Sequence, residues 1–231
     1  GKTTTTSMVA SVFLEANLNP TIQVGAYLDR IKGNYFVGGK DYFIIEACEY
    51  CDSYLNFHQK SAIVLNIDDD HLDYFKSIDN IQKSFEKYVS LLPSDGILVL
   101  NGDDERCLRL KDATKAKVIV IGSTEHALYS YRDVTFDSDG FATYDVYYKG
   151  NKETTISLHV AGMHNVLNSL CCVALCREYG ISYEDIQAGL SSFYGAKRRL
   201  EYIGTFKGAK IFDDYGHHPT EIRATVNSLV K

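Results

Sequence analysis

The first residues of the chain have the types and spacing of a phosphate-binding loop. Gly1, Lys2, Thr3 and Thr4 match the second half of such a loop and lead directly into a helical pattern. In that arrangement, backbone N–H groups at a helix N-terminus face the phosphates, the lysine reaches the terminal ones, and the threonine holds magnesium. A Gly-Lys-Thr tripeptide also occurs by chance, so the interpretation depends on what the rest of the sequence offers.

Polar residues end two of the apolar segments further along the chain. Glu46 follows the apolar residues 42–45, and His71 lies in the polar run 66–73 that ends the next apolar segment. Open α/β sheets bind ligands at the carboxyl ends of their strands, where an acid and an imidazole can hold magnesium. The aspartates 68–70 are read as turn formers and helix caps, which leaves His71 as the preferred ligand.

Two asparagines share one face at the start of a predicted helix. Asn165 and Asn168 are three residues apart, and an asparagine amide can pair with the donor and acceptor edge of adenine. Capping of the helix explains Asn165 equally well, but it explains Asn168 less well.

The last part of the chain has a second concentration of charge. Arg198 and Arg199 begin an apolar segment, and residues 213–219 read Asp-Asp-Tyr-Gly-His-His-Pro before another helical pattern. Proline suits the first turn of that helix. Two aspartates beside two histidines are seldom core residues, so this run is a candidate site that includes Asp214 and His217.

The elements that must position these residues follow from hydrophobic patterning. Short, continuously apolar runs predict strands buried on both faces, as in a parallel sheet covered by helices. These runs are residues 21–24, 42–45, 61–67, 96–100 and 117–121. Residues 2–17, 78–92 and 104–111 have helical patterns between them. The first 122 residues therefore predict a doubly wound α/β fold with a mostly parallel sheet.

After residue 128 the hydrophobic pattern changes from continuous to alternating. Alternating apolar and polar residues over 129–160, interrupted by turn sequences, predict a small antiparallel β extension. Helices are expected at 165–179 and, after a Ser182–Asp185 capping pair, at 183–193; two final strands are expected at 200–203 and 209–212. No linker or repeat divides the chain, which predicts a single domain over residues 1–231.

Composition limits the class of protein. The net charge is −6 without a run of basic residues, so nucleic acid is not expected as a partner. No apolar run approaches the roughly 20 residues that span a bilayer, and no signal peptide is evident, so we expect a cytoplasmic protein without membrane insertion. Cys171, Cys172 and Cys176 are predicted to be core residues, and the pair Cys48 and Cys51 is interpreted as coincidence.

Together, the motifs resemble those of the Mur ligase family, in the same order and from end to end of the chain. The matching segments are residues 1–8, 66–73, 162–168, 195–201 and 213–222. The most specific is Asp-Asp-Tyr-Gly-His-His-Pro-Thr-Glu-Ile, which is similar to the L-alanine-adding branch. The peptide-recycling branch tends to have Phe-Ala before the histidines.

The resemblance implies a central ATP-binding domain between a domain that binds the UDP-sugar and one that helps to bind the amino acid. The start at Gly1 without a methionine, and the end at Lys231 in a helical pattern, are expected to be cuts. The implied activity belongs to peptidoglycan precursor synthesis. ATP phosphorylates the lactyl carboxylate of UDP-N-acetylmuramate, and the amine of L-alanine then displaces phosphate to form an amide.

The resemblance also implies roles for individual residues. Lys2 would contact the β- and γ-phosphates, with Gly1 and Thr4 in the same loop; Thr3 and Glu46 would hold one Mg²⁺, and Glu46 with His71 a second. Asn165 and Asn168 would contact adenine beside His164. Arg199 would neutralise phosphate charge, Asp214 would face the ribose, and His217 would lie near the incoming amine.

The sequence departs from the family pattern in one motif. The usual Glu-Ala-Asp-Glu reads Glu46-Ala47-Cys48-Glu49, so the role of its aspartate is in doubt. Some Mur ligases hold metal through a carbamylated lysine, and the comparable position lies near Glu86, between Lys83 and Lys87, where none is assigned. Two alternatives remain: a recycling ligase that adds a peptide to UDP-N-acetylmuramate, and an ATP-binding module without chemistry of its own.

Overall fold

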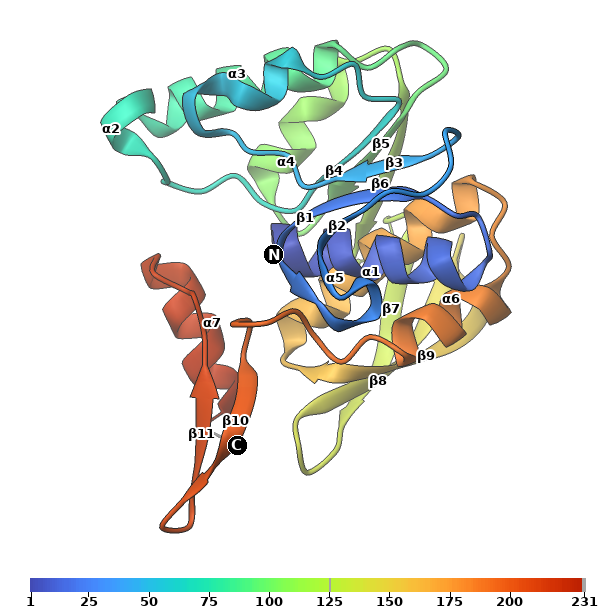
Figure 1. The fold of residues 1–231 in the computed structure, drawn as a ribbon. Helices are drawn as coiled ribbons and strands as arrows, with labels where there is room; N and C mark the ends of the chain where they lie inside the picture. The colour runs from blue at the N-terminus through green and yellow to red at the C-terminus, as the bar shows by residue number, and fades with distance from the viewer. Residues whose placement is uncertain (125, 230–231) are drawn as a thin grey trace.

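A computed structural model describes residues 1–124 and 126–229. The predicted helical end at Lys231 lies outside these residues. The chain folds into α/β layers, with a hairpin and a last helix beside them (Figure 1).

A six-stranded sheet forms the centre of the molecule. Its order is β4 (Ser61–Val64), β5 (Ile97–Asn101), β6 (Lys117–Gly122), β7 (Tyr129–Phe136), β8 (Phe141–Tyr148) and β9 (Asn151–Ala161). Strands β4 to β7 are parallel, and β7 to β9 are antiparallel. The predicted antiparallel strands are confirmed, and they continue the parallel sheet through the pairing of β6 with β7.

The predicted parallel strands are divided between two sheets. Strand β1 (Thr21–Leu28) pairs in parallel with β3 (Phe43–Ile45) and antiparallel with β2 (Gly33–Phe36), in a separate three-stranded sheet. The predicted doubly wound α/β fold with a mostly parallel sheet is confirmed, and β1 and β3 lie outside the six-stranded sheet. Apolar runs predict buried strands but do not specify which strands pair, because pairing depends on tertiary contacts.

Helices cover both faces of the central sheet, as a doubly wound fold requires. On one face lie α1 (Lys2–Glu15), α5 (Met163–Glu178) and α6 (Tyr183–Ser191); on the other lie α2 (Leu72–Phe75), α3 (Ile78–Ser90) and α4 (Glu105–Arg109). Short 3₁₀ turns complete the body at Asp29–Ile31, Tyr50–Asn56 and Leu110–Ala113. Strand β5 shows the alternation directly, because Val99 packs into one core while Leu98 and Leu100 pack into the other.

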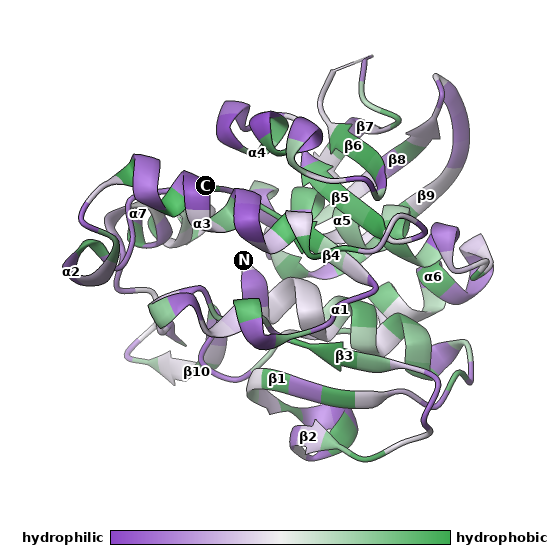
Figure 2. Cartoon of the chain, turned by 90° about the horizontal axis from the view of Figure 1, so that it is seen from above, coloured by the Kyte–Doolittle hydropathy of each residue, from purple (hydrophilic) through white to green (hydrophobic). Residues whose placement is uncertain are grey.

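Helix α5 is buried between the sheet and α1, which explains its apolar surface (Figure 2). Cys171, Cys172 and Cys176 are fully buried there, so the prediction that they are core residues is confirmed. Burial raises the pKa of the Cys171 thiol well above its ordinary value. The cap of α6 is also confirmed, since the Ser182 hydroxyl accepts a hydrogen bond from the Asp185 N–H at 3.1 Å.

Helices α1 and α6 approach closely at Gly189. A Cβ atom added there would lie 2.6 Å from the Cα of Val12. We expect Gly189→Ala to lower the free energy of unfolding by about 1–3 kcal/mol, because the two helices would have to separate. Gly33→Ala is the control in chemical denaturation, since its Cβ would meet only ordinary contacts from 3.6 Å. Equal loss in both variants would contradict this packing.

Strands β10 (Glu201–Phe206) and β11 (Ala209–Asp213) form a hairpin followed by α7 (Pro219–Leu229). These elements lie beside the α/β layers in Figure 1. The buried hydrophobic residues of the described chain extend from Met8 to Ala196 and include none from this segment. No helix in the described ranges is long and apolar enough to cross a membrane.

Candidate functional site

A cleft of about 1690 Å³ runs between the start of α1, the start of α5 and the segment that carries the hairpin and α7. It is lined by all the predicted site residues except His71 and His217. These lining residues are Gly1, Lys2, Thr3, Thr4, Glu46, His164, Asn165, Asn168, Arg199 and Asp214. Residues spread over more than two hundred positions of sequence are thus gathered at one cleft.

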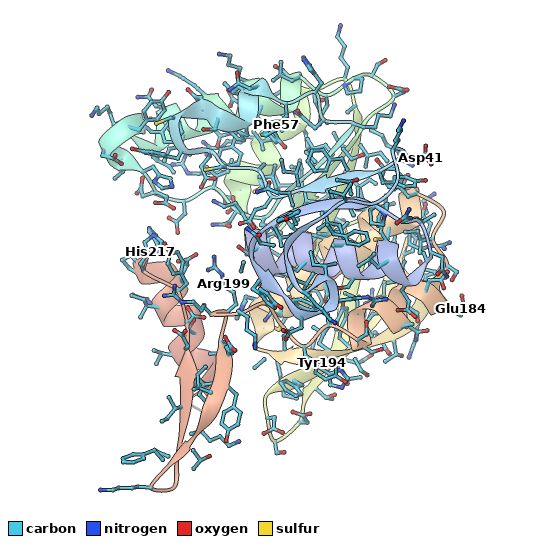
Figure 3. All side chains as sticks on the ribbon, viewed as in Figure 1. Asp41, Phe57, Glu184, Tyr194, Arg199 and His217 are labelled. Atoms are coloured by element: carbon cyan, nitrogen blue, oxygen red, sulfur yellow. The ribbon has the colours of Figure 1, made fainter. Side chains whose placement is uncertain are left out.

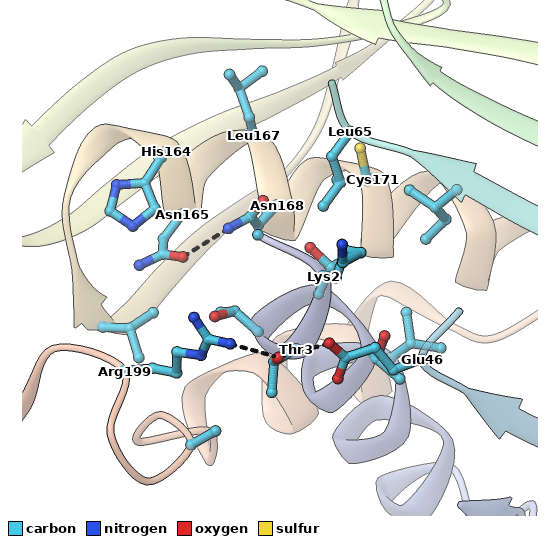
Figure 4. A pocket seen from close by; sticks show the side chains of 18 of the residues that line it. Lys2, Thr3, Glu46, Leu65, His164, Asn165, Leu167, Asn168, Cys171 and Arg199 are labelled. Carbon is cyan, nitrogen blue, oxygen red and sulfur yellow. Dashed lines mark hydrogen bonds between the residues drawn. The ribbon is translucent and has the colours of Figure 1, made fainter. Parts of the chain in front are cut away.

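The centre of the site is the Thr3 hydroxyl in the first turn of α1. Glu46 follows β3 directly, and its Oε1 accepts a hydrogen bond from Thr3 Oγ1 at 2.8 Å (Figure 4). Arg199 Nη2 donates to the same hydroxyl at 3.2 Å. The other carboxylate oxygen, Glu46 Oε2, accepts from the Gly25 N–H at 2.6 Å. Strand ends and a helix start therefore fix a hydroxyl, a carboxylate and a guanidinium together.

These donor atoms fit a hard divalent cation. The Thr3 hydroxyl and the Glu46 carboxylate supply two adjacent oxygens, which is the type of ligand that Mg²⁺ prefers in proteins beside nucleotide phosphates. The guanidinium of Arg199 offers several N–H donors in a planar fork, which suits phosphate oxygens. The cleft can thus hold both the cation and the anionic groups that it accompanies.

Lys2 has a partner that the sequence interpretation missed. Its Nζ lies 2.5 Å from Oε1 and 2.7 Å from Oε2 of Glu49. Glu49 is only 8% exposed and lines the same cleft. A signal existed in the sequence, since Glu49 closes the acidic tetrapeptide that begins at Glu46, but nothing in the spacing linked it to Lys2.

The two asparagines at the start of α5 form a buried pair. Asn168 Nδ2 donates to Asn165 Oδ1 at 2.9 Å, and Asn165 Nδ2 donates to the carbonyl of Ala161 at 2.8 Å (Figure 4). Neither amide makes a cap hydrogen bond, since the N-cap residue is Gly162. Both amides face the cleft and lie on the helix face that the spacing predicts.

His164 and Asp214 also line the cleft. Burial lowers the pKa of His164 below its ordinary value, so the ring is neutral at pH 7. Asp214 accepts backbone hydrogen bonds from Leu200 at 2.7 Å and from Gly216 at 2.7 Å. The carboxylate therefore ties together the two loops that carry Arg199 and the histidine pair.

His71 lies outside the cleft lining, in a different group of ligand atoms. One ligand atom each from Glu49, Asp70 and His71 lies within 4.8 Å of the others, and no Glu46 atom belongs to this group. The imidazole of His71 packs on Tyr50 with ring centroids 4.8 Å apart. Asp70, read as a turn former from the sequence, is thus next to the predicted ligand.

The histidine pair divides between two positions. His217 is exposed at the start of α7, where its Nδ1 lies 3.2 Å from the Tyr215 carbonyl (Figure 3). His218 lines the cleft, and its Nε2 lies 2.7 Å from the carbonyl of Asp69. His218 therefore connects α7 to the loop that carries His71.

Comparison with known proteins identifies the family to which the chain belongs. The family model described as the Mur ligase middle domain matches residues 1–176. The chain is 48% identical over 229 residues to a UDP-N-acetylmuramate–L-alanine ligase of Lachnospira eligens, covering 99% of this chain and 50% of that protein. It is 46% identical to the protein of the same name from Clostridium perfringens, over 100% of this chain and 50% of the relative. The chain thus spans about half the length of these relatives.

Solved structures show the same fold. A UDP-N-acetylmuramate-alanine ligase from Thermotoga maritima superposes with a TM-score of 0.85 at 28% identity, over 99% of this chain and 51% of that one. A UDP-N-acetylmuramate:L-alanyl-γ-D-glutamyl-meso-diaminopimelate ligase from Neisseria meningitides superposes with a TM-score of 0.75 at 27% identity. The match covers 86% of this chain and 64% of that one.

Proposed function

Because the chain belongs to the Mur ligase family, we propose that it is the central ATP-binding part of an ATP-dependent ligase that joins L-alanine to UDP-N-acetylmuramate. The observation that carries the proposal is that one cleft is lined by Lys2, Thr3, Glu46 and Arg199, with Thr3 hydrogen-bonded to both Glu46 and Arg199. A phosphate lysine, a hydroxyl–carboxylate pair and an arginine are the groups that phosphoryl transfer requires.

The reaction proceeds in two balanced steps. A lactyl carboxylate oxygen attacks the γ-phosphorus of ATP, and the bond from that phosphorus to the β-phosphate oxygen breaks. ADP departs as the leaving group, and an acyl phosphate is formed. The amine of L-alanine then attacks the acyl carbon, phosphate leaves with the carboxylate oxygen, and the amine loses a proton as the amide forms.

The residues of this chain position and neutralise charge in these steps. Lys2 and Arg199 would lie where negative charge spreads over the transferred phosphoryl group, and fixed positive groups there would lower the barrier. Thr3 and Glu46 would hold Mg²⁺, which supplies further charge neutralisation at the phosphates. His71, beside Asp70 and Glu49, would take part in a second metal site, and His217 would lie near the incoming amine.

The adenine end of the cleft is assigned to the asparagine pair. Asn165 and Asn168 face the cleft beside the neutral ring of His164, a setting that suits a heteroaromatic base. Asp214 would lie on the ribose side. Gly1 and Thr4 complete the lining at the start of α1 and would lie close to the phosphates.

Two features support L-alanine over a peptide as the added group. The relatives from Lachnospira eligens and Clostridium perfringens are both named for L-alanine, and residues 213–222 resemble that branch. The relatives are about twice as long as this chain, which supports separate parts for the UDP-sugar and the amino acid. Residues 1–231 would be one domain of a cytoplasmic enzyme.

The test is an assay of ADP release by the full-length protein that contains this chain. With ATP, Mg²⁺ and UDP-N-acetylmuramate, we expect release to depend on L-alanine and to be at least tenfold slower with the tripeptide L-alanyl-γ-D-glutamyl-meso-diaminopimelate. Preference for the tripeptide would assign the chain to the recycling branch. Nucleotide binding without any acceptor-dependent release would indicate a binding module.

Asn168→Leu is expected to weaken ATP binding by about 10- to 100-fold while leaving affinity for the UDP-sugar almost unchanged. The substitution removes an amide that faces the cleft and leaves the Asn165 carbonyl oxygen without its donor. Calorimetric titration of the full-length protein with each ligand measures the two affinities.

Asn80→Leu is the matched control. Asn80 also lies in the first turn of a helix, and its amide donates to the carbonyl of Phe75 at 2.7 Å, but it does not line the cleft. We expect ATP affinity to be unchanged in this variant. If Asn168→Leu weakened both ligands equally, the asparagine pair would have only a structural role.

A further inference from the structure

The contact between Lys2 and Glu49 has a consequence for how nucleotide and cation bind together. We propose that Glu49 is a positioning residue that holds the phosphate lysine in the nucleotide-free protein and releases it when a nucleotide binds together with its divalent cation. The inference rests on the proposed nucleotide site, and it gives Glu49 a role there.

Lys2 already has an anionic partner in the structure. Both carboxylate oxygens of Glu49 lie within 2.7 Å of Lys2 Nζ, so the ammonium is directed at the carboxylate. A phosphate that approaches Lys2 must compete with this partner. The Lys2 side chain is 51% exposed and its stem is flexible, so it can leave Glu49 without any rearrangement of α1.

The carboxylate of Glu49 is left behind when Lys2 turns away. The Glu49 side chain is only 11% exposed, so departure of Lys2 leaves a largely buried carboxylate without its compensating charge. That cost opposes binding of phosphate alone. This cost applies to a nucleotide that binds without metal, because its phosphates engage Lys2 and bring no positive charge to compensate Glu49.

A divalent cation would remove this cost. One ligand atom each of Asp70 and His71 lies within 4.8 Å of a Glu49 carboxylate oxygen and of the other. Two carboxylates this close repel each other unless a cation lies between them. A divalent cation that arrives with the nucleotide would therefore compensate Glu49 when Lys2 turns to the phosphates. Binding of phosphate and binding of cation become coupled through one side chain.

The experiment measures ADP affinity of the full-length protein by calorimetry, once with EDTA and once with Mg²⁺. Glu49→Gln removes the competing charge, so we expect metal-free ADP to bind about three- to tenfold more tightly than in the wild type. The gain in affinity on adding Mg²⁺ should shrink by at least the same factor. Unchanged or weaker metal-free binding would overturn the proposal.

A double-mutant cycle keeps the test independent of folding. In a Lys2→Gln background there is no lysine to release, so Glu49→Gln should leave metal-free ADP affinity unchanged, and the doubly substituted pair is electrically neutral. The same tightening in that background would overturn the proposal. Glu184→Gln is the charge-matched control, since Glu184 is exposed in the first turn of α6 and far from Arg199 in Figure 3.

The outcomes separate this inference from the proposed function. If wild-type protein bound no ADP under either condition, the nucleotide site itself would be wrong. If wild-type protein bound ADP and Glu49→Gln did not tighten metal-free binding, only the role of Glu49 would be wrong.

Discussion

Glu46→Gln in the full-length protein is expected to lower kcat by about 10²- to 10³-fold at saturating ATP and Mg²⁺. The carboxylate accepts hydrogen bonds from both Thr3 and Gly25, so it is fixed before any ligand binds. Glutamine has nearly the same shape but no charge, and it is a poorer ligand for a hard cation. The loss should fall on the phosphoryl transfer step, where charge neutralisation matters most. Steady-state ADP release measures it.

Glu178→Gln is the control for this experiment. Glu178 is a largely buried carboxylate that pairs with Lys117 at 2.6 Å, away from the cleft. We expect its turnover to stay within about twofold of the wild type, because neither Glu178 nor Lys117 lines the cleft. Near-normal turnover of Glu46→Gln at saturating Mg²⁺ would remove Glu46 from the site.

Residues 1–231 produced alone are expected to fold but to make no UDP-N-acetylmuramoyl-L-alanine. Folding is expected because the buried residues from Met8 to Ala196 form a core on each face of the central sheet. Catalysis is not expected, because groups outside this chain would have to hold the acceptor carboxylate and the amine at attack distance. Such orientation is worth roughly 7 to 11 kcal/mol, so its loss would abolish detectable turnover.

The measurement combines a thermal melt with product analysis by mass spectrometry. A cooperative melt without product is the expected result, and the full-length protein under the same conditions is the positive control. Turnover by residues 1–231 would show that the acceptor site lies within this chain, and the proposed division among three domains would be wrong.

The sequence predicted most elements of the fold for identifiable reasons. Continuously apolar runs mark β4, β5 and β6 because these strands are buried on both faces, and the change to alternation at Tyr129 marks the antiparallel strands. The division of the parallel strand pairs between two mixed sheets was not predictable. Strand β3 pairs with β1 rather than with β4, and that choice depends on contacts among distant residues.

The sequence predicted those residues of the candidate site whose type and position in an element together indicate a role. Lys2, Thr3 and Glu46 were found from their places at a helix start and a strand end, and the structure brings them to one cleft. Glu49 was missed because a carboxylate three residues after another has no fixed direction in a loop. The position of His71 next to Asp70 and Glu49 depends on a left-handed backbone at His71, with φ of 51°, which no spacing rule predicts.

The most direct test of the central claim follows an oxygen atom. UDP-N-acetylmuramate labelled with ¹⁸O in its lactyl carboxylate is incubated with the full-length protein, ATP, Mg²⁺ and L-alanine, and the released phosphate is analysed by mass spectrometry. An acyl phosphate transfers one carboxylate oxygen to phosphate, so we predict one ¹⁸O in each phosphate released and the other in the new amide. Unlabelled phosphate alongside formed product would contradict the account, because the carboxylate would then not have been phosphorylated.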